Sequence, residues 1–230
     1  MRVRGAEHAQ PGRVAKKPEA PEERRSAAPF VPETASIRKL SAAAHECTGC
    51  DLYRNATQVV FGAGPQKARV MFVGEQPGDQ EDRQGLPFVG PAGAMLDKAL
   101  EDAGIPRDEV YVTNAVKHFS WEPRGKRRIH KKPRASEIKA CRPWLEAEVR
   151  VLKPVVLVCL GATAAQSVLG PQFKLMQMRG QVHASALAER VVATIHPSAV
   201  LRAPDSEGRR LAYESLVADL KVVAKALKKL

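Results

Sequence analysis

Apolar positions in this chain follow two alternating patterns. Short runs rich in β-branched residues are typical of buried parallel strands, and they occur at residues 69–75, 109–117, 155–161 and 191–196. Elsewhere apolar residues recur every three or four positions, which predicts helices at residues 91–103, 136–152, 162–169 and 207–227. Pro91 and Gly104 are placed to begin and end the first helix, and Ser136 and Pro154 to cap and stop the second.

Strands that alternate with helices predict an α/β fold, here a three-layer α/β/α sandwich around a central, mostly parallel four-stranded sheet. Ligands of such sheets bind beyond the carboxyl ends of the strands, so residues just past those ends are the candidate site. They are Gly74 to Gly78, Asn114 to His118, Gly161 to Thr163 and His196 to Ser198.

Residues 1–34 hold five prolines, mixed charges and hardly any large apolar side chains. Such a segment cannot bury enough surface to offset the entropy of ordering, so we expect a disordered tail followed by one folded domain at 35–230. The chain has no apolar run near the ~18 residues that span a bilayer, and its start lacks a signal peptide's apolar core. We therefore expect a cytoplasmic protein without a membrane partner.

The formal net charge of +12 is concentrated in residues 117–142, which contain ten basic and two acidic residues. This excess favours a polyanionic partner such as nucleic acid. Phe119, Trp121 and two prolines interrupt the charges, so we expect a long ordered loop that meets phosphates and unpaired bases, although a solvated surface is the simpler alternative. The candidates for backbone contact are Lys126, Arg127, Lys131 and Lys132.

Two segments rich in glycine and proline follow the first strand, at residues 74–82 and 85–93. Alone they indicate turns. Glu75 at the strand end and Phe88 before the next helix add a carboxylate and an aromatic ring on which a base can stack. The segments lack the GxxxxGK[ST] pattern of nucleoside triphosphatases.

Cys47 and Cys50 form a CxxC pair, and His118 and Cys141 follow a predicted strand and lie on a predicted helix. These four residues suit zinc and an iron-sulfur cluster equally well. Cys159 lies inside a strand and is best explained as a buried apolar residue. His196, followed by Pro197, is placed either to donate to a ligand oxygen or to serve as a structural histidine.

Together these motifs stand in a specific order between Cys47 and Ala218: CTGC, GEQPGDQED, LPFVGPAG, VTNAVK, ACRPWL, VLVCLGATA and HPSA. In this order the chain resembles the iron-sulfur uracil-DNA glycosylases of families 4 and 5. It is most similar to their UdgX-type branch, because residues 126–130 read KRRIH.

The resemblance implies roles for individual residues. Glu75 would orient the attacking group, Phe88 would stack on a flipped uracil, Asn114 would read its Watson-Crick edge, and His196 would donate to its oxygen. Gln76, Gly78, Asp79 and Arg128 would also contact the substrate. Cys47, Cys50 and Cys141 would bind a 4Fe-4S cluster, and His118 stands where ordinary family 4 members have the fourth cysteine.

The resemblance further implies a monomeric bacterial enzyme, associated with the nucleoid, that acts on uracil in single-stranded DNA or on a flipped base. In the UdgX branch, His130 would attack C1′ of the sugar and remain bonded to it, which gives a single-turnover protein-DNA crosslink. We expect repulsion from Arg127, Arg128, Lys131 and Lys132 to keep this imidazole neutral. Two alternatives remain: a turning-over glycosylase that uses water, and a non-catalytic nucleic-acid-binding module held together by zinc.

Overall fold

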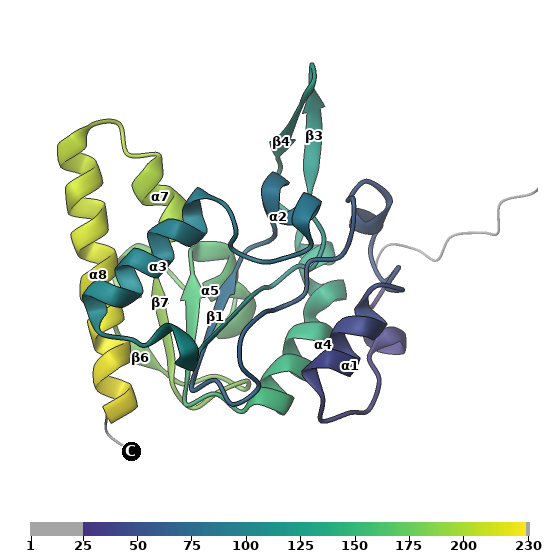
Figure 1. Cartoon of the computed structure of the whole chain (residues 1–230), viewed down its shortest axis with the longest axis horizontal. Coiled ribbons are helices and arrows are strands. Elements are labelled where there is room, and N and C mark those ends of the chain that lie inside the picture. Colours follow the sequence, from purple (N-terminus) through teal and green to yellow (C-terminus); the bar gives the residue numbers. More distant parts are fainter. Residues whose placement is uncertain (1–24, 229–230) are drawn as a thin grey trace, which may run out of the picture.

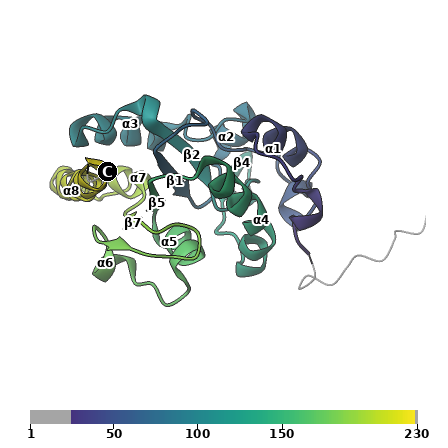
Figure 2. The same cartoon turned by 90° about the horizontal axis from the view of Figure 1, so that it is seen from below.

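A five-stranded sheet lies between two layers of helices in the computed structural model, which describes residues 25–228 (Figures 1 and 2). The strand order is β2-β1-β5-β7-β6. Four strands are parallel: β1 (Val70–Gly74), β2 (Val110–Asn114), β5 (Val156–Leu160) and β7 (Val191–Thr194). The predicted parallel core is therefore confirmed. The fifth strand, β6 (Val182–His183), is an antiparallel edge strand too short to produce a sequence pattern.

Alternate residues of the central strands pack on opposite faces of the sheet. On one face, Phe72, Val158 and Val192 pack against α3 (Pro91–Ala103), α7 (Pro197–Leu201) and α8 (Ser206–Lys228). Met71 and Val73 face α4 (Ala135–Leu152) and α5 (Ala162–Leu169). Because both faces are covered, these strands are almost entirely apolar. The buried Thr113 hydroxyl donates to Glu148, whereas the buried Thr194 hydroxyl has no hydrogen-bond partner among the described residues.

A third apolar cluster joins α4 to α1 (Ile37–Ala44) and encloses the CxxC segment. The shorter helices are α2 (Asp79–Gln84), α6 (Leu175–Met178) and the 3-10 turns η2 (Ala28–Phe30), η3 (Asp51–Arg54) and η4 (Arg107–Glu109). No described helix is long and apolar enough to cross a membrane.

The predicted helix ends hold for α3, where Pro91 begins the helix and Gly104 follows it at φ 71°. At α4 the prediction of Ser136 as the cap is wrong. The helix begins one residue earlier, and the Glu137 side chain accepts a hydrogen bond from the Arg134 backbone N–H at 2.7 Å. Glu137, at the third helical position, thus satisfies the N–H of the residue before the helix, whereas a capping serine would accept from an N–H two or three residues further on.

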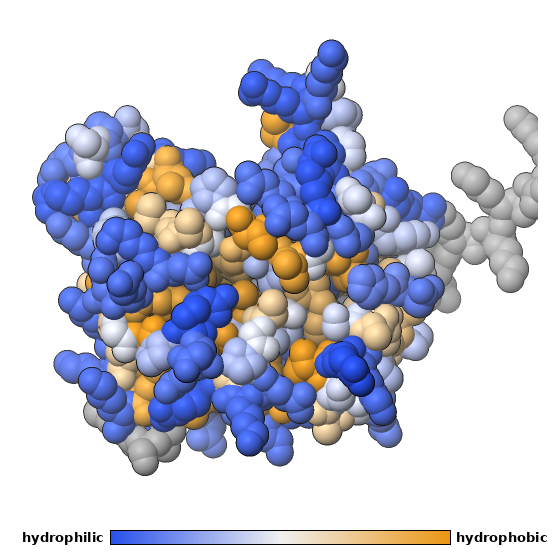
Figure 3. All heavy atoms as spheres, in the orientation of Figure 1, coloured by the Kyte–Doolittle hydropathy of each residue, from blue (hydrophilic) through white to orange (hydrophobic). Residues whose placement is uncertain are grey.

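The basic segment is a β-hairpin rather than the predicted loop. β3 (Trp121–Arg124) pairs antiparallel with β4 (Arg127–His130), and Gly125 turns the chain between them at φ 59°. The hairpin projects from the body of the protein (Figure 1), and its surface is hydrophilic (Figure 3). A strand pair without an apolar face lacks the alternation by which strands are predicted.

The described part of the predicted tail is ordered, contrary to the expectation for residues 25–34. Ala27 is 1% exposed and its N–H donates to Ala140 O of α4 at 2.7 Å, while Arg25 pairs with Asp51. A few small apolar residues that pack onto an existing core need no periodic pattern. Residues 1–24 of the predicted tail lie outside the described residues.

Candidate active site at the carboxyl edge of the sheet

A cavity of about 640 Å³ opens at the carboxyl ends of the parallel strands. It brings together residues from several separate segments of the chain, as expected for this edge of an α/β sheet. The predicted site residues that line it are Glu75, Gln76, Gly78, Phe88, Asn114, His130, Lys132 and His196.

Asn114 ends β2 opposite Gly74 and is 3% exposed. A Cβ on Gly74 would collide with the Asn114 side-chain oxygen and would lie 2.9 Å from the Phe88 ring. Glycine at this position therefore lets the amide and the aromatic ring approach each other across the strand end.

Phe88 has φ 57°, a left-handed conformation that non-glycine residues rarely adopt. A Cβ on Gly93 would collide with the Phe88 carbonyl, so Gly93 is needed to accommodate this backbone. The Phe88 ring lies roughly parallel to His196, at 6.1 Å between centroids and 23° between planes. The strained backbone thus holds an aromatic wall of the cavity in place.

His196 is held as a neutral hydrogen-bond donor. Its Nδ1 accepts from the Ser198 backbone N–H at 3.1 Å, so the ring proton lies on Nε2. Ser198 Oγ lies 2.8 Å from the same nitrogen and accepts from Arg202 Nη1 at 2.8 Å. Burial, then the charge of Arg202 and the proximity of His130, lower the pKa of His196 to about 4.

Arg202 was not singled out from the sequence. It lines the cavity and lies four residues after Ser198, on the same side of a helical turn. The only sequence feature that pointed to Arg202 is its four-residue spacing from Ser198. This spacing becomes informative only once the structure shows that Ser198 bonds to His196.

His130 lies at the end of the hairpin with its Nε2 directed at two residues of the β1 end. Gln76 Nε2 is 2.8 Å away and Glu75 Oε1 is 3.7 Å away. The Ser120 N–H donates to Gln76 Oε1 at 2.8 Å, which orients the amide so that its NH₂ group faces His130. The same NH₂ group also donates to Ser120 O at 3.1 Å and to Lys131 O at 3.0 Å. An amide nitrogen cannot accept a hydrogen bond, so the His130 Nε2 beside it is the acceptor and the ring proton lies on Nδ1.

The pKa of His130 is below its ordinary value of 6.5, as predicted, but the predicted cause is wrong. Partial burial is the largest contribution; Glu75 opposes it and Arg202 adds to it. None of the flanking basic residues is among the causes: Arg127 lies at the exposed tip of the hairpin, Arg128 is already ion-paired, and Lys131 and Lys132 are exposed to solvent. Successive side chains of a strand point to opposite faces, so residues adjacent to His130 in sequence are directed away from its imidazole.

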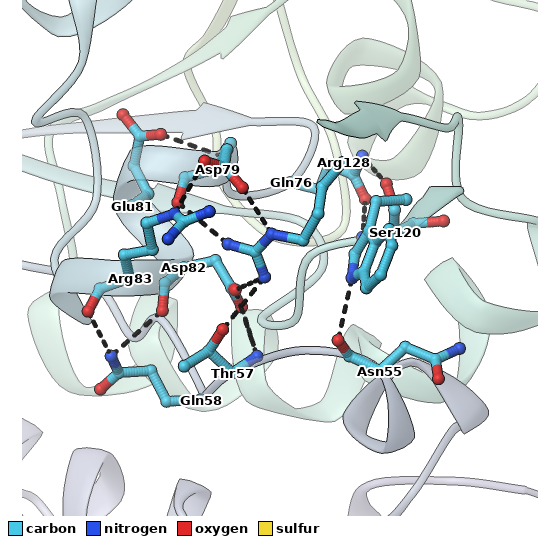
Figure 4. Close-up of polar contacts among 12 residues, drawn as sticks. Asn55, Thr57, Gln58, Gln76, Asp79, Glu81, Asp82, Arg83, Ser120 and Arg128 are labelled. Atoms are coloured by element: carbon cyan, nitrogen blue, oxygen red, sulfur yellow. Dashed lines mark hydrogen bonds and ion pairs between the residues drawn. The ribbon is translucent and has the colours of Figure 1, made fainter. Parts of the chain in front are cut away.

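Arg128 and Asp79, predicted to bind substrate, instead attach the hairpin to α2 and do not line the cavity (Figure 4). Arg128 Nε donates to Asp79 Oδ1 at 2.5 Å, and Nη1 donates to Asp82 Oδ2 at 2.6 Å and to Thr57 Oγ1 at 3.0 Å. The guanidinium also lies 5.5 Å from the centroids of two aromatic rings, Phe119 and Trp121. This anchor sets the position of His130, two residues further along β4.

A buried ion pair beneath Asn114 was not predicted. Lys117 and Glu148 side chains are 1% and 0% exposed, and Lys117 Nζ lies 2.6 Å from Glu148 Oε2. Lys117 Nζ also donates to Asn114 O at 2.8 Å and to Thr113 Oγ1 at 2.5 Å. Tyr111 donates to the other Glu148 oxygen at 2.9 Å. The pair therefore fixes the backbone of the strand end that carries Asn114.

Three of the predicted metal ligands lie in one apolar cluster. Cys47, Cys50 and Cys141 are buried together with Trp144. The Trp144 indole donates to Cys47 Sγ, and the Lys117 N–H donates to Cys141 Sγ, both at 3.3 Å. Burial raises the pKa of Cys50 to about 11 and that of Cys141 to about 12, and the neighbouring thiols contribute.

His118 is 6% exposed and lines a cavity of about 350 Å³ together with Cys47. Within residues 25–228, no three His, Cys, Asp or Glu side chains are arranged to hold a single metal ion. Thiols gathered in an apolar enclosure, two of which accept N–H hydrogen bonds, fit an iron-sulfur cluster, which is larger than one ion. Cys159 is buried on β5 among other apolar residues, as predicted.

Comparison with known proteins gives one consistent result. The model of the Uracil DNA glycosylase superfamily matches residues 61–221. The chain is 38% identical over 172 residues to the type-4 uracil-DNA glycosylase of Thermotoga maritima, which covers 74% of this chain and 86% of that protein. It is 36% identical over 176 residues to the type-4 enzyme of Archaeoglobus fulgidus, covering 74% and 83% respectively. A type-5 uracil-DNA glycosylase of Thermus thermophilus is 35% identical over 125 residues, covering 48% and 53%. The chain therefore belongs to the uracil-DNA glycosylase superfamily.

Proposed function

We propose that this protein excises uracil from DNA. The observation that carries the proposal is the convergence of Asn114, Phe88 and His196 on one cavity at the carboxyl edge of the sheet. The amide of Asn114 offers a donor and an acceptor, which match uracil O4 and N3–H and mismatch cytosine at both positions. The names of the relatives, type-4 and type-5 uracil-DNA glycosylases, support the same substrate.

The geometry suits departure of an anionic base. A base inside a duplex is out of reach, so the target is single-stranded or flipped out. As the C1′–N1 bond breaks, its electron pair leaves with uracil. The His196 Nε2–H can donate to the oxygen that gains charge, and with its pKa near 4 this imidazole stays neutral throughout the physiological range. The Glu75 carboxylate lies in the same cavity, where it can stabilise the cationic sugar.

Two nucleophiles that could attack C1′ are compatible with this cavity: water and the imidazole of His130. The type-4 relatives favour water and a turning-over enzyme. The position of His130 favours covalent capture, because its Nε2 faces the cavity beside Glu75 and its lowered pKa leaves the imidazole unprotonated at neutral pH. In capture, the Nε2 lone pair leaves Gln76 and bonds to C1′, and the Nδ1 proton then passes to solvent. An imidazole held in place has a high effective concentration relative to water.

Base recognition by Asn114 is tested by exchanging its amide for a carboxylate. We expect Asn114→Asp to lose uracil excision by about 100-fold or more, because the donor to O4 is gone and a buried charge is added. The variant is expected to gain weak action on cytosine. Release of free base from uracil-containing and cytosine-containing oligonucleotides measures both effects.

The matched control is Gln172→Glu, the same chemical change at an exposed residue. If Asn114→Asp released uracil as fast as wild type, Asn114 would not be the residue that recognises the base.

We further propose that Cys47, Cys50, Cys141 and His118 bind a 4Fe-4S cluster with a structural role. Such a cluster supplies no step of the reaction and connects the η3 region to α4 and the end of β2. We expect the purified protein to be brown and to contain iron, and Cys47→Ser to lose iron and to unfold at a lower temperature.

Iron analysis, visible absorption and thermal unfolding provide the readouts, and Cys159→Ser is the control cysteine. Colourless protein that contains zinc would support the non-catalytic module. Full colour and stability in Cys47→Ser would contradict the ligand assignment.

Binding to DNA should depend steeply on salt, because the exposed basic side chains of the hairpin region face phosphates. Each phosphate that the protein neutralises makes the slope of log K against log salt more negative by about 0.7 to 0.9. Replacing Lys131 and Lys132 with glutamine removes up to two such contacts, so the slope should become less negative by up to twice that amount. Neutralising Lys225 and Lys228 of α8 is the control, and equal slopes in both double variants would place the DNA elsewhere.

A further inference from the structure

A second cavity lies beside the first and shares Lys132 with it. It has a volume of about 240 Å³, far more than one water needs, and opens between the base of the hairpin and η3. Its walls include Phe119, Trp121, Lys131 and Arg134. Lys132 lines both cavities, so the two adjoin at this side chain.

Trp121 presents a fixed aromatic surface to this cavity. Its indole N–H donates to Asn55 O at 2.8 Å, and Arg128 lies 5.5 Å from its ring centroid. Trp121 also pairs directly with His130 across the hairpin. A ring that is already immobilised loses little entropy when a planar group stacks on it.

The charge of the second cavity suits a phosphodiester chain. Its two acids are already paired, Asp51 with Arg25 and Glu137 with Arg134. Among the ion pairs of the described residues none involves Lys132, which lines both cavities. A phosphate that joins two nucleotides would meet this charge if one nucleotide occupied each cavity.

We propose that the second cavity binds the nucleotide next to the flipped uracil in single-stranded DNA, with its base stacked on Trp121 and the joining phosphate at Lys132. The proposal rests on the proposed function, since uracil in the first cavity sets the position of its neighbour. Stacking on an aromatic side chain is tolerant of base identity. The subsite therefore selects an unpaired neighbour and not a sequence.

The test uses single-stranded oligonucleotides with one 2′-fluoro-2′-deoxyuridine, whose fluorine slows cleavage of the glycosidic bond so that binding can be measured. In two further probes the nucleotide on the 5′ or the 3′ side is an abasic tetrahydrofuran. We expect one of these, and not the other, to bind about 5- to 150-fold more weakly, the range of one lost base stack.

Tryptophan fluorescence gives an independent readout. The chain has two tryptophans, and Trp144 is fully buried, so quenching by the full oligonucleotide reports on Trp121. We expect the quenching to disappear with the abasic probe that binds weakly. Trp121→Ala should bind all three probes with equal affinity, and Trp121→Phe should restore the difference. Tyr213→Ala, which removes an aromatic ring between α3 and α8, is the matched control and should behave as wild type.

Because each variant is judged by the ratio of its affinities for two probes, partial misfolding does not alter the reading. Equal binding of both abasic probes by wild-type protein, or an unchanged ratio in Trp121→Ala, would overturn the subsite. A wild-type protein that binds the uracil analogue no better than thymidine in the same oligonucleotide would overturn the proposed function, and the subsite with it.

Discussion

Replacement of His130 by serine should abolish the covalent protein-DNA adduct and convert the protein into a turning-over glycosylase. Wild-type protein mixed with a uracil-containing oligonucleotide is expected to give a band that survives heat and detergent, with at most one DNA per protein. His130→Ser removes the nitrogen that lies 2.8 Å from Gln76 and leaves Glu75, Asn114 and His196 in the cavity. Water then takes the place of the imidazole, so free uracil should accumulate beyond one equivalent.

The pH dependence of adduct formation provides a second measurement. Only the unprotonated imidazole carries the attacking lone pair, and the pKa of His130 lies below 6.5 because of its partial burial. The rate of capture should therefore stay constant from pH 8 to pH 7 and decline only as the pH falls below that ordinary value.

His183→Ser is the control for His130→Ser, because His183 lies at the sheet edge and bonds to Met178 O. An adduct that never forms in wild type would leave the water-using glycosylase as the function. An adduct that persists in His130→Ser would show that another residue attacks C1′. Uracil release that vanishes together with the adduct would instead make His130 essential for excision itself.

Loss of either partner of the buried Lys117–Glu148 pair should destabilise the fold by about 3 to 5 kcal/mol, because the remaining charge stays buried without a counterion. Both side chains are at most 1% exposed, and the carboxylate also accepts from Tyr111 and Thr113. The double variant Lys117→Met/Glu148→Gln removes both charges and should recover much of this loss. Urea unfolding of the two single variants and the double variant measures the free energies.

The control is Glu109→Gln, which removes a carboxylate from the opposite end of the sheet. Its partner Arg69 is 41% exposed, so the cost should be about 0 to 1 kcal/mol. A single variant of the buried pair as stable as Glu109→Gln would show that the pair is not a stabilising element. If the double variant Lys117→Met/Glu148→Gln folds and still excises uracil, the pair contributes more to folding than to the placement of Asn114.

Local patterns were sufficient for the parallel sheet and for much of the candidate site. Strands covered on both faces are apolar throughout, so β1, β2, β5 and β7 appear as uninterrupted runs in the sequence. Proline and glycine at the ends of α3 act through their own backbone preferences, which need no tertiary information. Because parallel strands end at one edge, Glu75, Asn114 and His196 could be assigned to one site before their distances were known.

How these parts are held in place depends on contacts between segments that lie far apart in the chain. The hairpin has no apolar alternation, and its position comes from the contacts of Arg128 with Asp79 and Asp82, which lie more than forty residues away in sequence. Long-range contacts with α4 also position Lys117, which pairs with Glu148, and the segment 25–34, in which the Ala27 N–H donates to Ala140 O. Local sequence patterns are enough to predict which chemical groups reach the carboxyl edge, since strand ends are local features. Which of them line the cavity, which anchor the hairpin and which histidines stay neutral depend on burial and on long-range pairing, and these exist only in the folded chain.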